Sequence, residues 1–290
     1  MTANEFCDRV RSRGLKAIAG AERTVWVTHE RFSMLRLPSC FLNVPRKNEI
    51  RDVFKQSHAL MLSYVVEPTP ERPPNALLYL CTDPNYSLEK LGKNARYDVR
   101  RGLREFEIRF LEQKEVHRLG KQAYYDTLIR TGLSPKQRGN FDHAFGRPLR
   151  DKCFLGALKA GQLAAFLQIM EVNDWVSLGG YSANQFLPFC PNNALVFYAV
   201  EHYLGRQKRR VVDYGLSSIQ AMSNAEGLDH FKRKMGFATT PVHRVFDVNP
   251  LVRPFVSRVT SSIVSGMLKI FPRHSMLKKA DGALRLLLQP

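Results

Sequence analysis

Residues 211–237 read VVDYGLSSIQAMSNAEGLDHFKRKMGF and predict a buried strand, a polar loop and a capped helix. Val211 and Val212 begin the strand, and Asp213 and Tyr214 follow them directly. Side chains just beyond the end of a strand are the usual place for chemistry in an open α/β sheet. We therefore expect functional side chains within residues 213–218.

The second part of this stretch predicts a helix. Ser223 and Glu226 have the spacing of a capping box, and Gly236 is a stop signal. Lys232 lies directly beside Phe231, so the pair is either a core residue next to a solvated charge or one wall of an active site. The predicted apolar stripe consists of Leu228, Phe231 and Met235.

The composition describes an ordinary globular protein with a strong excess of positive charge. The 290 residues are 44% hydrophobic and 24% charged, and the formal net charge is +18. Such an excess favours anionic partners, namely phosphorylated substrates, RNA or an acidic membrane surface. Charge alone does not choose among these classes.

Cysteine and histidine spacing argue against disulfides and metal sites. The five cysteines are scattered and never form a CxxC pair, which favours a reducing, cytoplasmic location. The eight histidines show no HExxH-like spacing, so we expect no metal and no permanently bound cofactor. Neither an export signal nor a membrane-spanning run is evident.

The chain divides into three predicted segments, 1–104, 105–248 and 249–290. The first segment predicts a small α/β layer with two strands within 24–37, a helix at 47–63 and a strand at 76–81. The middle segment predicts a strand at 106–110, helices at 115–131 and 135–145, three antiparallel strands at 153–159, 163–172 and 175–181, a helix from 191, the strand and helix quoted above, and a strand near 242–247.

A helix predicted from Ser87 to about Arg104 carries a basic ridge. Its buried face is predicted to consist of Leu88, Leu91, Ala95, Val99 and Leu103. Another face carries the ridge itself, which consists of Lys93, Arg96, Arg100 and Arg104. A ridge of this density suits phosphate, but a solvated helix face that aids solubility explains it equally well.

Four motifs occur in the order of a known family: 93–101 (KNARYDVRR), 191–195 (PNNAL), 212–215 (VDYG) and 227–236 (GLDHFKRKMG). With the element order of 105–248, they resemble the GNAT acyltransferases, and most closely the branch of Fem-type peptidoglycan-bridge aminoacyltransferases and Fem-like acetyltransferases. The resemblance implies an α/β (α+β) fold: a mixed sheet flanked by helices, with a degenerate N-terminal half, a functional GNAT half at 105–248 and an amphipathic helical tail. The CoA-binding signature is missing, because 182–193 contains no glycine, and the coiled-coil arm of many bridge-forming members is absent.

The resemblance implies a site at a splayed pair of parallel strands, where backbone N–H groups stabilise an oxyanion. This gap is expected between residues 181–182 and 213–215. Asp213 is a candidate to accept a proton from the amine or to hold its ammonium form, and Tyr214 or Tyr181 is a candidate donor to the leaving group. Alternatively, Asp213 caps a turn and both tyrosines only pack.

The resemblance also suggests groups that bind substrate or phosphate. Lys232 matches a lysine that follows a phenylalanine in the Fem-type pattern, and its charge suits an oxyanion or a phosphate. Asn193 lies at a predicted helix N-terminus, where it either favours a pyrophosphate or RNA phosphate or only caps the helix. The predicted binding residues are Phe231, Asn193, Arg96, Arg100, Lys93, Ser182 and Ser217.

The tail carries an apolar face formed by Val252, Val256, Val259, Ile263 and Met267, together with seven Lys or Arg and one Asp. Such a segment either lies on an anionic membrane or packs over the catalytic half or a second copy, and we expect packing.

We expect an N-acyltransferase that moves an acyl group from a thioester, an acyl-CoA or acyl-carrier protein, to a small amine. An alternative donor is aminoacyl-tRNA, with the basic ridge and residues 206–210 on RNA phosphates. A further alternative is a non-catalytic GNAT-like module that binds RNA or a membrane.

Overall fold

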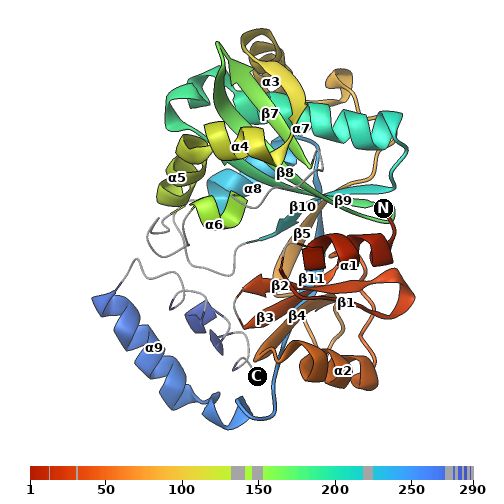
Figure 1. The fold of residues 1–290 in the computed structure, drawn as a ribbon, viewed down its shortest axis with the longest axis vertical. Helices are drawn as coiled ribbons and strands as arrows, with labels where there is room; N and C mark the ends of the chain where they lie inside the picture. Colours follow the sequence, from red (N-terminus) through yellow and green to blue (C-terminus); the bar gives the residue numbers. More distant parts are fainter. Residues whose placement is uncertain are drawn as a thin grey trace.

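The computed structural model describes residues 1–12, 14–30, 32–131, 141–145, 153–217 and 225–271, with 277, 280–282, 284, 285 and 288. These residues form an eleven-stranded mixed sheet in the order β1-β2-β3-β4-β11-β5-β10-β9-β8-β7-β6. Helices lie on both faces of the sheet (Figure 1). The predicted mixed sheet flanked by helices is therefore confirmed.

The N-terminal part of the sheet contains β1 (Ala17–Ala19), β2 (Val25–Glu30), β3 (Ser33–Leu37) and β4 (Met61–Val66), with α1 (Ala3–Ser12) and α2 (Lys47–Ser57). The two strands predicted within 24–37 are confirmed. The helix predicted at 47–63 is too long, because His58 takes a left-handed conformation with φ 54° and ends it. The chain then enters β4, which the sequence analysis did not predict.

The remaining elements follow the predicted order closely. They are β5 (Ala76–Cys81), α3 (Lys93–Glu105), β6 (Glu107–Leu111), α4 (Gln113–Leu119), α5 (Lys121–Arg130), α6 (Phe141–Phe145), β7 (Phe154–Lys159), β8 (Gln162–Val172), β9 (Trp175–Ser182), α7 (Pro191–Val200), β10 (Val211–Leu216), α8 (Ala225–Lys234), β11 (Ala238–Val248) and α9 (Arg258–Ile270). The antiparallel pairing of β7 with β8 and of β8 with β9 confirms the predicted three-strand meander.

Some predicted boundaries are wrong. The single helix at 115–131 is two helices, α4 and α5, which meet at Gly120. The ridge helix begins at Lys93 rather than beside Ser87, after a short 3-10 turn at Leu88–Lys90. Leu103 is 37% exposed and does not belong to the buried face. Of the helix predicted at 135–145, the described residues contain α6, and the capping box of Ser223 lies outside them.

The last strand joins the two parts of the sheet. The first half of β11, from Ala238 to Val242, pairs with β5, and the second half, from His243 to Val248, pairs with β4. Strand β5 also pairs with β10, although it comes from the segment 1–104. The sheet therefore runs without a break across the division that the sequence predicts at residue 104.

Helices on the two faces bury separate cores beside β7, β8 and β9. Residues of α3 and α7, such as Val99 and Leu195, pack with Met235, which follows α8, on one face. Phe141 and Phe145 of α6 pack with α4 and α5 on the other face. In Figure 1, α4, α5 and α6 lie together over the upper part of the sheet, while α9 stands at the lower left edge of the molecule.

Candidate functional site

Strands β9 and β10 run parallel and separate before either strand ends. Their last register pair is Asp213 with Ser177, whereas β10 continues to Leu216 and β9 to Ser182. An irregularity between Asp213 and Leu216 also interrupts the pairing of β10 with β5. The strands thus diverge where the sequence analysis expects a gap.

The side chain of Tyr214 reaches across this gap from β10 toward β9. A Cβ atom placed on Gly180 would lie 3.1 Å from the Tyr214 hydroxyl oxygen. The ring of Tyr214 packs edge-on against Phe231 and Phe237, with centroid distances of 6.1 and 5.4 Å. Burial raises the pKa of Tyr214 to about 12, so its hydroxyl keeps its proton at neutral pH. The Tyr214 hydroxyl is therefore a hydrogen-bond donor in the gap between β9 and β10.

Lys232 is buried beside Tyr214, with only 3% of its surface exposed. Its Nζ lies 4.1 Å from the centre of the Tyr79 ring and 5.5 Å from that of Tyr214, and it donates to the Leu216 carbonyl over 3.3 Å. The two ring faces attract the ammonium group. The structure thus rules out a solvated charge at Lys232.

Two opposing effects set the pKa of Lys232. Burial lowers it to about 8, while the negative charges of Asp213 and Asp229 partly oppose this shift. The side chain therefore remains mainly an ammonium group at pH 7 and loses its charge in mildly alkaline solution. A buried cation with one hydrogen bond to a carbonyl is available to an anionic group that enters beside it.

Tyr79 is held in place from its hydroxyl end. The Tyr79 hydroxyl donates a hydrogen bond to Asp229, and the Arg233 Nε donates to both oxygens of Asp229 over 3.2 Å. The Tyr79 bond is the main reason that the pKa of Asp229 is lowered. Sequence reasoning missed Tyr79, because strand 76–81 was assigned to a part without a site, and only the strand order places it beside β10.

A pocket of about 250 Å³ opens next to Lys232. The pocket is partly open to solvent, so an acyl or amino group can enter it from outside. Ser217 lines the pocket, but its Oγ accepts from the Leu77 N–H over 2.9 Å and fixes the end of β10 to β5. The wall of the pocket also includes Tyr79, Leu216, Glu226, Asp229 and Lys232.

The Asp213 carboxylate is fully buried and accepts hydrogen bonds from protein groups. Oδ1 accepts from the Gly215 N–H over 2.5 Å, Oδ2 accepts from Trp175 Nε1 over 3.1 Å, and the Ser39 hydroxyl is a further partner. Burial raises the pKa of Asp213 to about 6 despite these bonds. These contacts connect β10, β9 and the loop after β3. The Asp213 side chain therefore holds these three segments in position.

The structure does not bring Tyr181 or Ser182 to Lys232. Tyr181 packs on Phe166, with a centroid distance of 4.9 Å, in the core beneath α4, α5 and α6. The Ser182 hydroxyl is buried and accepts from Arg130 Nη2 over 2.9 Å and from Asn192 Nδ2 over 3.1 Å.

Asn193 lies in the first turn of α7, but its side chain faces the core. It is 8% exposed, and its Nδ2 lies 3.5 Å from the Met235 sulfur. Helix α3 approaches this helix end so closely that a Cβ on Gly102 would lie 2.5 Å from the Cys190 carbonyl oxygen. The contacts favour a packing role for Asn193.

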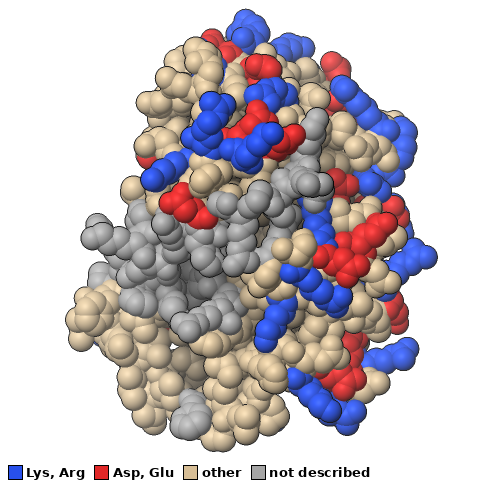
Figure 2. Space-filling view, in the orientation of Figure 1, with Lys and Arg blue, Asp and Glu red and all other residues tan. Residues whose placement is uncertain are grey.

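The basic ridge lies on α3, roughly opposite to Asp98 around the helix. Lys93, Arg100 and Arg104 are exposed, and Arg96 is half-buried. Asp98 of α3 pairs with Lys234 of α8 over 2.5 Å, which connects the two helices. On the face in Figure 2, Lys and Arg are mixed with Asp and Glu along the upper and right parts of the surface.

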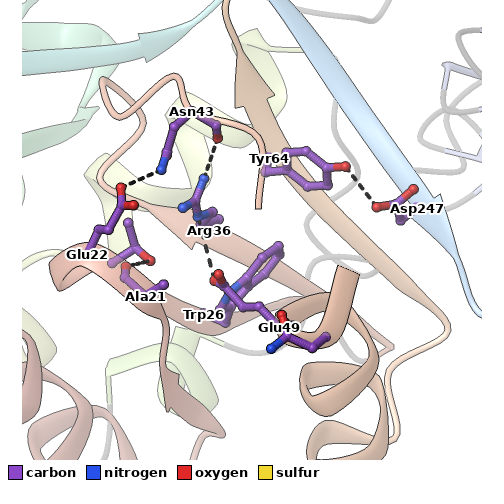
Figure 3. A network of polar contacts seen from close by, with 10 residues as sticks. Ala21, Glu22, Trp26, Arg36, Asn43, Glu49, Tyr64 and Asp247 are labelled. Carbon is purple, nitrogen blue, oxygen red and sulfur yellow. Dashed lines mark hydrogen bonds and ion pairs between the residues drawn. The ribbon is translucent and has the colours of Figure 1, made fainter. Parts of the chain in front are cut away.

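In the N-terminal part, β3 and β4 also run parallel, and a polar network lies where they diverge (Figure 3). The last register pair of β3 and β4 is Leu35 with Ser63, and the next residue, Arg36, is 2% exposed. Arg36 Nη1 donates to the Asn43 carbonyl over 2.7 Å, and its Nε lies 3.9 Å from Glu49. Protein groups therefore occupy the position where β3 and β4 diverge.

Solved structures share this architecture. FemX aligns with 87% of this chain and 98% of its own, at 10% identity and a TM-score of 0.54. The chain has a Fem-like GNAT fold. L-PGS from Bacillus licheniformis aligns with 88% of this chain and 89% of its own (12% identity, TM-score 0.48), and a GCN5-related N-acetyltransferase from Kribbella flavida with 86% and 96% (12% identity, TM-score 0.41). No protein-family model matches the sequence, and the search of curated proteins found no match.

At this identity the likeness concerns the fold, so the chemistry of this Fem-like GNAT fold rests on its own side chains. Among the described residues, no group of three or more His, Cys, Asp or Glu is placed to hold a metal ion. Within the same part of the chain, no helix is long and apolar enough to cross a membrane. The structure brings Lys232, Tyr214 and Phe231 together, and it adds Tyr79 and Asp229 to them.

Proposed function

We propose that this protein catalyses amide-forming acyl transfer from an activated donor to an amine. The observation that carries the proposal is the buried ammonium group of Lys232, which lines a small pocket at the end of β10 and lies 5.5 Å from the centre of the Tyr214 ring. Acyl transfer to an amine creates negative charge on the carbonyl oxygen and then on the leaving group. A fixed cation and a phenolic donor match those two needs.

In the proposed reaction, the nitrogen of a neutral amine attacks the carbonyl carbon of the donor. A C–N bond forms and the carbonyl becomes an oxyanion, which the ammonium group of Lys232 stabilises. The bond to the leaving group then breaks, and the Tyr214 hydroxyl donates a hydrogen bond to the departing atom. The leaving group finally carries the proton that the amine nitrogen loses, so the products are an amide and a protonated leaving group.

The walls of the pocket suit a small amine as the acceptor. Glu226 and Asp229 place carboxylate groups beside Lys232 at the pocket. Carboxylates attract the ammonium form of an amine. We therefore assign the acceptor to the side of α8.

An acyl thioester, either an acyl-CoA or an acyl-carrier protein, is the first candidate donor, supported by the GNAT resemblance. Aminoacyl-tRNA is the second, supported by the exposed ridge of Lys93, Arg100 and Arg104 on α3. The missing CoA signature favours the second candidate. Phosphate contacts from three or four such cations would make binding strongly dependent on salt.

Product formation with each donor tests the proposal. Purified protein is incubated with a panel of amines and either acyl-CoA or aminoacyl-tRNA, and amide products are detected by mass spectrometry. Amide formation that Lys232→Met reduces supports the proposed site, while no product from any donor overturns it. For the RNA donor, Arg96→Ala with Arg100→Ala should weaken tRNA binding, whereas Arg118→Ala on α4 serves as the control.

A further inference from the structure

Helix α9 turns its apolar side chains away from the protein. No residue of α9 is buried. Val259, Ile263, Met267 and Ile270 are 69%, 57%, 41% and 72% exposed. At 100° per residue these four side chains share one arc of the helix. Within the described residues, Val252 and Val256 of the predicted stripe are half-buried, whereas its α9 residues do not pack over the catalytic half. Packing of the stripe against a second copy stays a prediction.

The opposite arc of α9 faces the protein and is more polar. Its five side chains are all half-buried: Thr260, Ser261, Val264, Ser265 and Leu268. The Ser265 hydroxyl donates to Asp281 over 2.5 Å, and Asp281 also pairs with Arg285 over 2.7 Å. A helix on a globular surface usually shows the reverse arrangement, with its apolar stripe inward. No other described residue buries this stripe, so an apolar partner would stabilise it.

Positive charge borders the outward stripe. Arg258 and Lys269 are both exposed and lie together on one flank of α9, about 80° to 100° around the helix from Val259. The segment 249–290 carries seven Lys or Arg against one Asp, and the whole chain has a net charge of +18. In Figure 1, α9 stands at the edge of the molecule, and Figure 2 shows no charged side chain over the same lower left region. The outward face thus combines an uncharged surface with a cationic border.

We propose that the outward face of α9 is a docking surface for an anionic phospholipid bilayer, on which the helix lies parallel to the membrane plane. The apolar arc enters the boundary between headgroups and acyl chains, and Arg258 and Lys269 contact the lipid phosphates. At about 1.5 Å per residue the helix is roughly 20 Å long, which suits lying on a bilayer rather than crossing it.

A second copy of the chain fits this face less well. A stable protein interface covers about 800 Å² on each partner, which four aliphatic side chains on one helix do not supply. Two copies that meet through α9 would also bring their cationic borders together, and each chain carries a net charge of +18. An anionic bilayer instead attracts the border and accepts the apolar arc.

Cosedimentation of the full chain with vesicles tests this proposal independently of the proposed activity. We expect binding to vesicles of phosphatidylcholine mixed with phosphatidylglycerol, weaker binding to phosphatidylcholine alone, and a decrease with added salt. Ile263→Asp should weaken binding by about tenfold or more, because the carboxylate opposes both the apolar boundary and the anionic headgroups. Ile129→Asp on α5 is the matched control, because Ile129 is 60% exposed.

A second variant protects the test against misfolding. Ile263→Trp keeps an apolar side chain, so it should bind like the parent chain and show a blue shift of its fluorescence on vesicles. Trp26 and Trp175 are 0% and 2% exposed and contribute little to such a shift. Equal vesicle binding by Ile263→Asp and the parent chain would overturn the proposal. Two other results would also overturn it: no binding of the parent chain to vesicles, or a dimer of the parent chain that Ile263→Asp disrupts.

Discussion

The ammonium nitrogen of Lys232 lies 4.1 Å from the centre of the Tyr79 ring, although one residue belongs to α8 and the other to β5. The strand order explains the contact: β5 pairs with β10, and α8 follows β10 in the chain. An aromatic face attracts the cation without neutralising it. The ring therefore offsets part of the cost of burying the Lys232 charge, which is still available to a substrate.

Replacing Lys232 by methionine should reduce turnover by about a hundredfold or more, since removal of one oxyanion-stabilising group has an effect of that size. The melting temperature should not fall, because the variant removes the desolvation penalty of a buried charge. Steady-state kinetics and thermal melting measure the two effects. Lys47→Met, at the exposed start of α2, is the control, and unchanged turnover in Lys232→Met would exclude this residue from the mechanism.

The rate at saturating substrate should fall as the pH rises through about 8, because the neutral amine of Lys232 no longer stabilises an oxyanion. An arginine at this position keeps its charge in that range. Any activity retained by Lys232→Arg should therefore lack the alkaline decrease. A pH–rate profile of both proteins is the measurement, and a parent profile that rises steadily through pH 8 to 10 would contradict the assignment.

Tyr214→Phe should lower turnover by about tenfold to a hundredfold, because it removes the donor to the leaving group but retains the ring. Packing against Phe231 and Phe237 should keep the melting temperature close to that of the parent chain. Tyr203→Phe is the matched control, since its hydroxyl donates to Glu171 over 3.0 Å away from the pocket. Equal loss of activity in both variants would show that the Tyr214 hydroxyl has no specific role in the reaction.

Gly180→Ala should lower both the melting temperature and turnover. The added Cβ would lie 3.1 Å from the Tyr214 hydroxyl oxygen, closer than ordinary van der Waals contact. Gly179→Ala should be nearly silent, because its Cβ has only the Gln168 carbonyl oxygen nearby, at 3.9 Å. Combining Gly180→Ala with Tyr214→Phe should restore most of the lost stability. Thermal melts of the parent chain and the three variants test this. Similar losses of stability in Gly180→Ala and Gly179→Ala would refute the close approach of Gly180 and the Tyr214 hydroxyl.

The contribution of Asp213 to the free energy of unfolding should be larger in mild acid than at neutral pH. Its folded pKa of about 6 exceeds the unfolded value of about 3.9, so the folded state holds the proton more tightly. The stabilising contribution is complete below about pH 4 and is lost as the pH rises through about 6, a change on the order of 3 kcal/mol.

Urea unfolding from pH 4 to 7 measures this contribution as the difference between the parent chain and Asp213→Asn. Other carboxylates titrate in the same range, but they cancel in that difference. The free energy of unfolding of the parent chain, relative to the variant, should decrease with increasing pH. A difference that is constant with pH would show that Asp213 has no raised pKa.

The sequence predicted the elements that have strong local signals. The strand predicted at 106–110 corresponds to β6, and the strands predicted at 163–172 and 175–181 form the hairpin of β8 and β9. Gly236, with φ 85°, ends the α8 segment. Failures occurred where local signals compete with tertiary contacts. Residues 61–63 were predicted as the end of a helix, but pairing with β3 and β11 makes 61–66 a strand.

Site residues were predicted less completely than the fold. Lys232, Tyr214 and Phe231 were predicted because they follow a strand end and match a family pattern. Tyr79 was not found, since nothing local to β5 marks it. Tyr181 and Tyr214 looked equivalent in the sequence, yet Tyr181 packs in the core beneath α4, α5 and α6, whereas Tyr214 packs in the opposite core with Phe231.

The sequence by itself determined which segments become strands and helices, because periodic burial and turn residues act over a few positions. It also determined the motif order and the large positive charge. Only the tertiary structure decided that Lys232 is buried between Tyr79 and Tyr214, that Asp213 bonds Trp175, and that α9 faces outward. Those outcomes depend on strand order and on which face of each element finds a partner, and both are set by contacts between residues far apart in the chain.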